Sequence, residues 1–151
     1  MTKKVLNIDP KKIRLVFIEE VSVNINDTDM AENKVTSFET NMAHLTAYNL
    51  EDKKFLFGLE LLLTKNNESN NSECKFRYNF HFIIDNLEEM YNINNEGLPV
   101  FQKLFVGTLS GISYSTLRGI VFEKTRKSNW DSIILPVINP TNLLDSWIEQ
   151  E

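Results

Sequence analysis

The chain has 151 residues, of which 42% are hydrophobic and 25% charged, a composition typical of one folded domain rather than of a disordered protein. Its formal net charge of −5 argues against nucleic-acid binding, which depends on clustered lysine and arginine. Cys74 is the only cysteine, so an intrachain disulfide and a cysteine-rich zinc site are excluded. We expect one domain over residues 1–151 in a reducing, cytoplasmic compartment, because neither a signal peptide nor a membrane-spanning apolar run is visible.

Four strand-like segments come first in the chain. The clearest spans residues 74–84, where apolar side chains alternate with polar ones as in a half-buried strand. Residues 55–63 repeat the pattern, but Leu56 and Leu62 lie on the opposite parity and show that this strand is apolar on both faces. Residues 13–25 and 38–48 are the other two strands. The short connections 49–53 and 66–73 predict hairpins and therefore antiparallel neighbours.

The period becomes helical after residue 97. An apolar stripe predicts one long helix from Leu98 to about Arg126, long enough to cross a four-stranded sheet. An extended apolar segment follows, and Asn139 with Pro140 is a good start for a short last helix that runs to about Glu149. The predicted fold class is therefore α+β, with a four-stranded antiparallel sheet covered by one long helix and a short C-terminal helix.

Small residues recur every fourth position on the predicted long helix, at Gly107, Gly111, Ser115 and Gly119. Each interior glycine lowers helix propensity by about 1 kcal/mol relative to alanine, so another backbone should approach closely here. The pattern leaves two alternatives open: packing on the chain's own sheet, or packing on a second copy of the same helix.

Catalytic and cofactor motifs are absent from the sequence. His44 and His81 fall on different predicted strands, lack metal-ligand spacing, and are expected at the sheet surface. No nucleophile elbow, phosphate loop or dinucleotide fingerprint is present. We therefore expect a protein that is not an enzyme and carries no metal or cofactor, which leaves a binding or scaffolding role.

Aromatic residues of the predicted strands favour the binding role. They are more numerous than one helix and one short C-terminal segment can bury. An exposed apolar patch on a soluble protein usually marks an oligomer contact or a ligand groove. The residues concerned are Phe17, Phe38, Phe55, Phe57, Tyr78, Phe80 and Phe82.

The order of these elements resembles the SecB family of protein-export chaperones. Glu20-Val21-Ser22-Val23 is similar to the family's first-strand signature of acidic, aliphatic, serine and aromatic residues. Tyr114 to Arg118 falls on its aromatic-proline-tyrosine-small-arginine run, and Leu135 with Ile138 and Asn139 falls on its leucine-x-proline-aliphatic-asparagine motif. The sequence departs from the family pattern at Asn24, Ser115, Val137 and Pro140.

The resemblance implies a homotetramer, built as a dimer of dimers with the long helices at its centre and the small-residue row at the interface. It also implies a SecA-like motor ATPase as a partner, and Glu20 and Arg118 are the docking candidates. By position, Arg118 is expected to hydrogen-bond carbonyls or an acidic partner at the helix surface.

The implied function is that of an ATP-independent holdase, which binds unfolded or precursor polypeptides through apolar grooves and serves protein export. The candidate groove residues are Phe17, Phe38, Met42, Phe80, Phe82, Trp130, Leu143 and Trp147. Two alternatives stay open: a dedicated partner that shields a single client such as an antitoxin or one exported substrate, and a carrier of an apolar small molecule.

Overall fold

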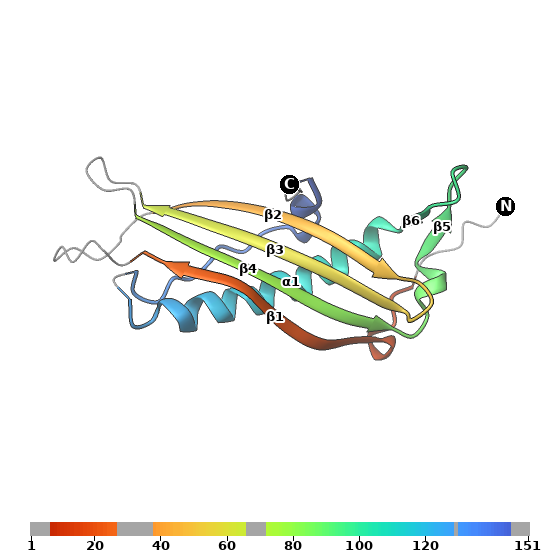
Figure 1. Ribbon diagram of the computed structural model, residues 1–151, viewed down its shortest axis with the longest axis horizontal. Coiled ribbons are helices and arrows are strands. Elements are labelled where there is room, and N and C mark those ends of the chain that lie inside the picture. Colours follow the sequence, from red (N-terminus) through yellow and green to blue (C-terminus); the bar gives the residue numbers. More distant parts are fainter. Residues whose placement is uncertain (1–6, 27–37, 66–71, 129, 146–151) are drawn as a thin grey trace.

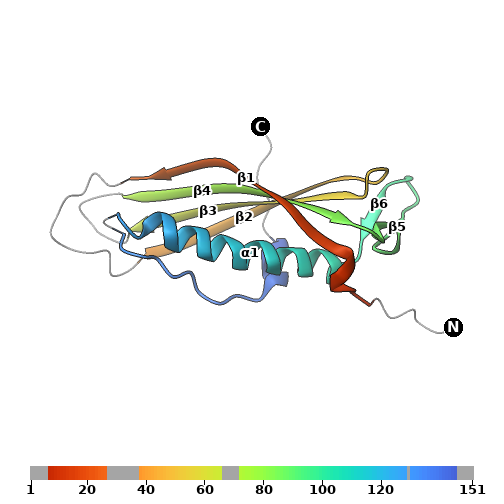
Figure 2. The same cartoon turned by 90° about the horizontal axis from the view of Figure 1, so that it is seen from below.

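The computed structural model describes residues 7–26, 38–65, 72–128 and 130–145. A four-stranded antiparallel sheet forms one layer, and a single long helix lies across one of its faces (Figures 1 and 2). The elements in chain order are η1 (Pro10–Lys12), β1 (Ile13–Ile25), β2 (Phe38–Asn49), β3 (Lys54–Lys65), β4 (Glu73–Ile84), η2 (Leu87–Glu89), β5 (Tyr91–Ile93), β6 (Pro99–Phe101), α1 (Lys103–Thr125) and η3 (Pro140–Asp145).

The four predicted strands and the α+β class are confirmed, and the strand order is β1-β4-β3-β2. β2 and β3 form the expected hairpin, with Asn49 opposite Lys54. β3 pairs with β4 without interruption, and β4 pairs with β1 from the first part of the chain. β1 and β2 are therefore the two edge strands.

The core lies between the sheet and α1. Alternate residues of β3 and β4 point to the helix side and are buried, and Phe105, Leu109 and Leu117 of α1 meet them from the other side. Five of the seven strand aromatics are buried inside the protomer, namely Phe55, Phe57, Tyr78, Phe80 and Phe82. The expected surplus of aromatics is thus largely wrong, because other segments besides α1 also cover this face of the sheet.

A second, two-stranded sheet is part of that extra cover. β5 pairs with β6 as a small hairpin between β4 and α1, so the expected helix start at Leu98 is wrong. Pro99 explains the error, because the residue before a proline is pushed into extended backbone. Phe101 of this hairpin packs edge-on against Phe55, with ring centroids 4.9 Å apart.

The extended segment after α1 supplies the rest of the cover. Three side chains of α1, four residues apart, donate hydrogen bonds to its carbonyls: Ser110 to Pro140 over 3.0 Å, Tyr114 to Pro136, and Arg118 Nε to Leu135 over 3.0 Å. Residues four apart lie on the same helix face, so these donors form one row. The row holds the segment along the helix, and Leu135 becomes fully buried.

The last described element begins as predicted. Asn139 caps it, with its side-chain oxygen accepting from the Thr141 backbone N–H over 3.1 Å. The element is a 3-10 helix from Pro140 to Asp145, and the remainder of the expected helix, to Glu149, lies outside the described residues.

Candidate functional site

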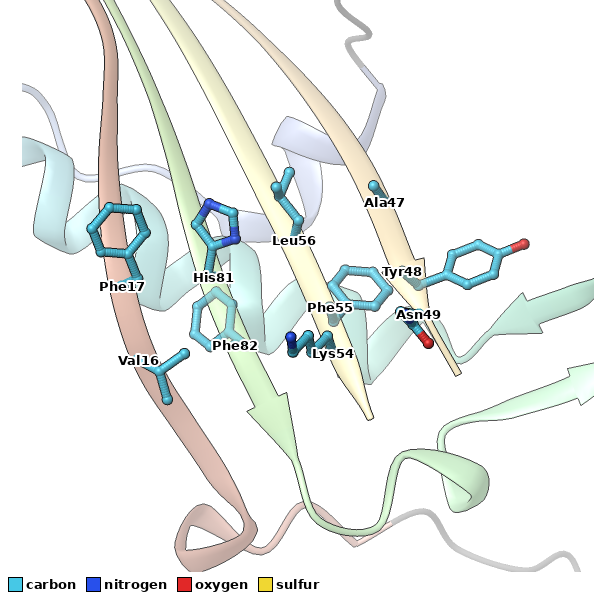
Figure 3. Close-up of a pocket in the computed structure, with 10 residues that line it drawn as sticks. All are labelled: Val16, Phe17, Ala47, Tyr48, Asn49, Lys54, Phe55, Leu56, His81 and Phe82. Carbon is cyan, nitrogen blue, oxygen red and sulfur yellow. The ribbon is translucent and has the colours of Figure 1, made fainter. Parts of the chain in front are cut away.

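A pocket opens on the sheet face opposite α1, which we call the outer face. One row of paired residues crosses all four strands here: Phe17 opposite His81, His81 opposite Leu56, and Leu56 opposite Ala47. The pocket has a volume of about 340 Å³, and Val16, Tyr48 and Lys54 are also among its lining residues (Figure 3). An engineered cavity of about 150 Å³ accepts benzene, so this space is enough for a large side chain.

Phe17 stands at this pocket because β1 contains two irregularities. Its pairing with β4 shifts between Leu15 and Phe17 and again between Glu20 and Ser22, which leaves Val16 and Val21 as extra residues. An extra residue changes which face the following side chains occupy. Leu15 therefore faces the helix side while Phe17, of the same sequence parity, faces out and is 58% exposed.

Polar contacts support the row formed by Phe17, His81, Leu56 and Ala47. His81 Nε2 donates to Glu19 Oε1 over 2.9 Å, and the Asn79 side-chain amide donates to the same oxygen over 3.1 Å. These two hydrogen bonds, first His81 and then Asn79, hold the pKa of Glu19 below its usual value. The Phe17 ring lies 5.4 Å from the His81 ring, so the hydrogen-bonded histidine also supports the aromatic wall.

Lys54 gives the pocket a positive charge. It is an exposed residue at the start of β3, opposite Ile83 of β4, and lies on the outer face beside Leu56 (Figure 3). Within the described residues, its ammonium makes no ion pair or hydrogen bond.

A second hollow lies along the far side of α1. Leu104, Ile112 and Ser115 of the helix line it together with Pro140 and Thr141 of η3, and its volume is about 690 Å³. Within the extended segment beside it, Val137 is 85% exposed and Ile134 68%. The chain thus leaves a wide apolar strip on the side of the helix that faces away from the sheet.

The predicted small-residue row packs in part on the chain's own η3. A Cβ at Gly107 would lie 3.3 Å from Thr141 Cγ2, and one at Gly111 would lie 3.3 Å from Pro140 Cγ. Ser115 and Gly119 continue the row as exposed residues, and a Cβ at Gly119 would meet nothing within 4 Å. The first half of the row therefore serves the protomer, and its role between copies stays a prediction.

The eight predicted groove residues fall into four groups. Phe80, Phe82, Trp130 and Leu143 are buried in the protomer core. Phe38 and Met42 are partly buried against the core, and Phe17 is exposed. Trp147 lies outside the described residues. Of the seven described residues, Phe17 and the buried Phe82 both line the outer-face pocket, and the structure does not bring all seven together as one groove.

The two predicted docking residues are both occupied within the protomer. The Tyr78 hydroxyl donates to Glu20 Oε1 over 2.7 Å, and Lys124 Nζ lies 3.3 Å from the same oxygen. The Tyr78 hydrogen bond and then that of Lys124 lower the pKa of Glu20, while burial and then Glu20 raise the pKa of Tyr78. Arg118 donates to a carbonyl, as its position suggested. Docking of a motor at either residue stays a prediction.

Sequence reasoning missed Leu56, Ala47, Tyr48 and Lys54 as members of a surface pocket. Leu56 carried a signal, because its parity placed an apolar side chain on the second face of β3. The two histidines were both expected at the surface, but His44 is buried and stacks on Phe57 with ring centroids 5.5 Å apart. Strand parity carried a signal, because His81 shares the polar parity of Arg77 and Asn79, whereas His44 shares the parity of Phe38 and Met42.

Comparison with known proteins gives no match to a family model or to a curated protein. Among solved structures, the fold matches a SecB-like chaperone of Mycobacterium tuberculosis in complex with a ChAD peptide from an antitoxin, with a TM-score of 0.62 and 11% identity. The match covers 85% of this chain and 92% of that one. The chain has a SecB-like fold. In this SecB-like fold the pocket described above lies on the sheet face that α1 leaves uncovered.

A second solved structure is a protein of unknown function from Streptococcus agalactiae, with a TM-score of 0.45 and 9% identity, covering 83% of this chain and 97% of that one. Over residues 7–26, 38–65, 72–128 and 130–145, no group of three or more His, Cys, Asp or Glu side chains could hold a metal ion. The same part of the chain has no helix long and apolar enough to cross a membrane.

Proposed function

We propose that this protein is an ATP-independent holdase, which binds unfolded or precursor polypeptides in the cytoplasm. The observation that carries the proposal is the open apolar pocket on the outer face of a SecB-like fold, with Phe17 at its edge. The Mycobacterium protein of this fold was solved with a peptide bound, which supports polypeptide as the ligand here.

The chemistry of the surface suits such a ligand. Burial of apolar area stabilises a complex by about 25 cal/mol per Å² and needs no specific pairing, so many unfolded sequences would bind weakly. A stretched client would contact several such surfaces, and linked contacts raise the overall affinity without any catalytic step. Phe17, Phe38 and Met42 are the predicted groove residues that keep some surface for a client.

Assembly forms the second part of the proposal. The strip formed by Leu104, Ile112, Phe122, Ile134 and Val137 is exposed in the protomer, and patches of this kind are usually covered. We expect second copies to cover it, with α1 and the exposed half of the small-residue row at the centre of a tetramer. Clients would then be held on surfaces away from this centre.

Light scattering tests the proposal directly. The purified protein should have the mass of four copies of the 17.6 kDa chain, and it should suppress aggregation of several unrelated, chemically unfolded proteins without ATP. The variant Phe17→Ser should keep the mass of four copies and lose part of the suppression of aggregation. A monomer that leaves aggregation unchanged would contradict the proposal.

A dedicated partner protein is the second candidate function. The peptide in the Mycobacterium complex comes from one antitoxin, which favours a role for a single client. Recovery of one stoichiometric partner from cells, together with failure to protect unrelated unfolded proteins, would favour this function over general holding. A SecA-like motor ATPase as a further partner, and a role in export, are tested by binding of the purified motor.

A further inference from the structure

Most charges around the outer-face pocket have a partner within the described residues. Glu19 accepts from His81, the Arg14 guanidinium lies 3.0 Å from Asp85, and the Asp52 carboxylate accepts from the side-chain amide of Asn49. Lys54 lines the pocket, is exposed, and has no ionic or hydrogen-bonding partner in the part of the chain that the structure describes. Among the lining residues, the charge left for a ligand to neutralise is therefore positive.

The sheet fixes where this charge lies relative to the apolar wall. Lys54 and Leu56 are two residues apart on β3, so both point to the outer face, about 6.8 Å apart along the strand. Lys54 belongs to the row that also holds Ile83 and Arg14, while Leu56 belongs to the neighbouring row with Phe17. The Lys54 ammonium thus lies beside the row that holds Phe17 and Leu56.

An extended peptide has the same spacing. Its side chains at positions i and i+2 point to one side and lie about 6.8 Å apart. We propose that the outer-face pocket recognises an extended polypeptide segment in which an apolar residue, placed in the pocket, is separated by one residue from an aspartate or glutamate that pairs with Lys54. This inference rests on the proposed function and names the client chemistry at one site.

Charge at the opposite end of the outer face limits the preference to the pocket. Glu39 and Glu73 are exposed and lie in one row through Thr64, ten residues along β3 from Lys54, or about 33 Å. A carboxylate of the client would be repelled there and attracted at Lys54.

A polypeptide fits this pocket better than a free amphipathic carboxylate does. The pocket is open and its walls come from neighbouring strands of one sheet, whereas small-molecule sites bury most of the ligand surface. A small molecule would keep one side in water here. A peptide chain would extend from the pocket over the neighbouring rows and cover more of the exposed apolar surface.

The test uses the full-length protein and short fluorescent peptides of matched composition. One peptide carries leucine-threonine-glutamate, one carries leucine-threonine-glutamine, and one carries leucine-glutamate-threonine, so that the carboxylate is absent or displaced. Anisotropy should show the first binding about two- to fivefold more tightly than the other two at low ionic strength, as expected for an exposed ion pair. High salt should remove the difference.

Variants assign the preference to one side chain. Lys54→Gln should abolish the advantage of the glutamate peptide over the glutamine peptide, whereas Lys54→Arg should keep this advantage. Lys103→Gln is the matched control, because Lys103 is an exposed lysine at the start of α1, outside the pocket. It should alter neither affinity.

Three results would overturn this inference. The first is equal affinity for all three peptides; the protein would then still bind polypeptide, and the proposed function would stand. The second is an advantage of the glutamate peptide that persists in Lys54→Gln. The third is decanoate binding that depends on Lys54 while no peptide binds, which would make the pocket a small-molecule site. If the protein also failed to suppress aggregation, the proposed function would fall separately.

Discussion

Phe17 and Phe80 lie on adjacent strands and have opposite environments. Phe80 is fully buried between the sheet and α1, whereas Phe17 points to the outer face. The difference comes from the pairing of β1 and not from the residue type. Truncation of the two rings should therefore affect different properties of the protein.

Phe80→Ala should lower the free energy of unfolding by about 3–5 kcal/mol, the usual cost of removing a buried phenylalanine ring. Phe17→Ala should change it by less than about 0.5 kcal/mol while it weakens peptide binding. Urea unfolding and anisotropy measure the two effects. A large loss of stability in Phe17→Ala would show that its ring is buried in solution, most simply between copies.

Glu20 links stability to pH. Its pKa is lowered in the folded chain by the Tyr78 hydroxyl and then by Lys124, so folding favours the ionised carboxylate. The resulting stability is present above the ordinary pKa of 4.5 and is lost as the pH falls through the folded value. The midpoint of urea unfolding should thus fall as the pH is lowered from 4.5 through the folded pKa of Glu20. The fall should be less steep in Glu20→Gln. Equal slopes would show that this carboxylate is not engaged in solution.

The small-residue row of α1 serves two different surroundings at the scale of the element. Gly107 and Gly111 allow η3 to lie close to the helix, whereas Gly119 faces open space in the protomer. A glycine in open space lowers helix propensity without any packing benefit inside the chain. Its substitution therefore separates protomer stability from assembly.

Gly119→Ala should raise the free energy of unfolding of the protomer by about 0.5–1 kcal/mol, because alanine is the better helix former. Gly58→Ala is the contrasting change, since its Cβ would lie 2.8 Å from both Asn79 Oδ1 and Leu45 Cγ. It should destabilise the protein by about 1–3 kcal/mol through overpacking. Thermal unfolding at low protein concentration measures both. Destabilisation by Gly119→Ala would mean that another chain covers this position.

The strands, the long helix and the capped C-terminal element could be predicted from sequence because each has a strong local period or a clear end signal. The start of α1 could not, because Leu98 and Phe101 fit the helical stripe and the strand Pro99–Phe101 is too short to show a period of its own. Phe17, a groove candidate, is exposed, but its parity with Leu15 hid the reason. A bulge leaves no periodic signal, and it is set by pairing with a distant strand.

The burial of four groove candidates could not be predicted for a different reason. Phe82 and Trp130 have the composition of a client groove, but burial depends on how many segments cover one sheet face. The hydrogen bonds from Tyr114 and Arg118 hold a segment in extended conformation over the core, and this cover has no sequence period. The motif residues thus had a structural role that resemblance alone did not reveal.

At the scale of the whole molecule, α1 lies on one side of the four-stranded sheet (Figure 2). The hollow on the far side of α1 and the pocket on the outer face of the sheet therefore lie on opposite sides of the molecule. One side can therefore join copies while the other remains open to clients. This separation explains how assembly and client binding could coexist in a small domain.

Phe122→Glu should reduce the mass of the particle, because it places a charge on the exposed strip of α1. Leu98→Glu is the control at another exposed apolar residue, outside α1, and should leave the mass unchanged. Multi-angle light scattering measures both. An unchanged mass in Phe122→Glu would place the contact between copies elsewhere.

The two extra residues of β1 have a consequence for how relatives of this chain should be compared. Leu15 and Phe17 face successive partners on β4, so loss of Val16 would straighten the strand and leave its ladder intact. The same holds for Val21 between Glu20 and Ser22. Homologous chains can therefore differ by one residue in the middle of this strand. An alignment that allows gaps only in loops would then misalign the part of β1 beyond that residue by one position.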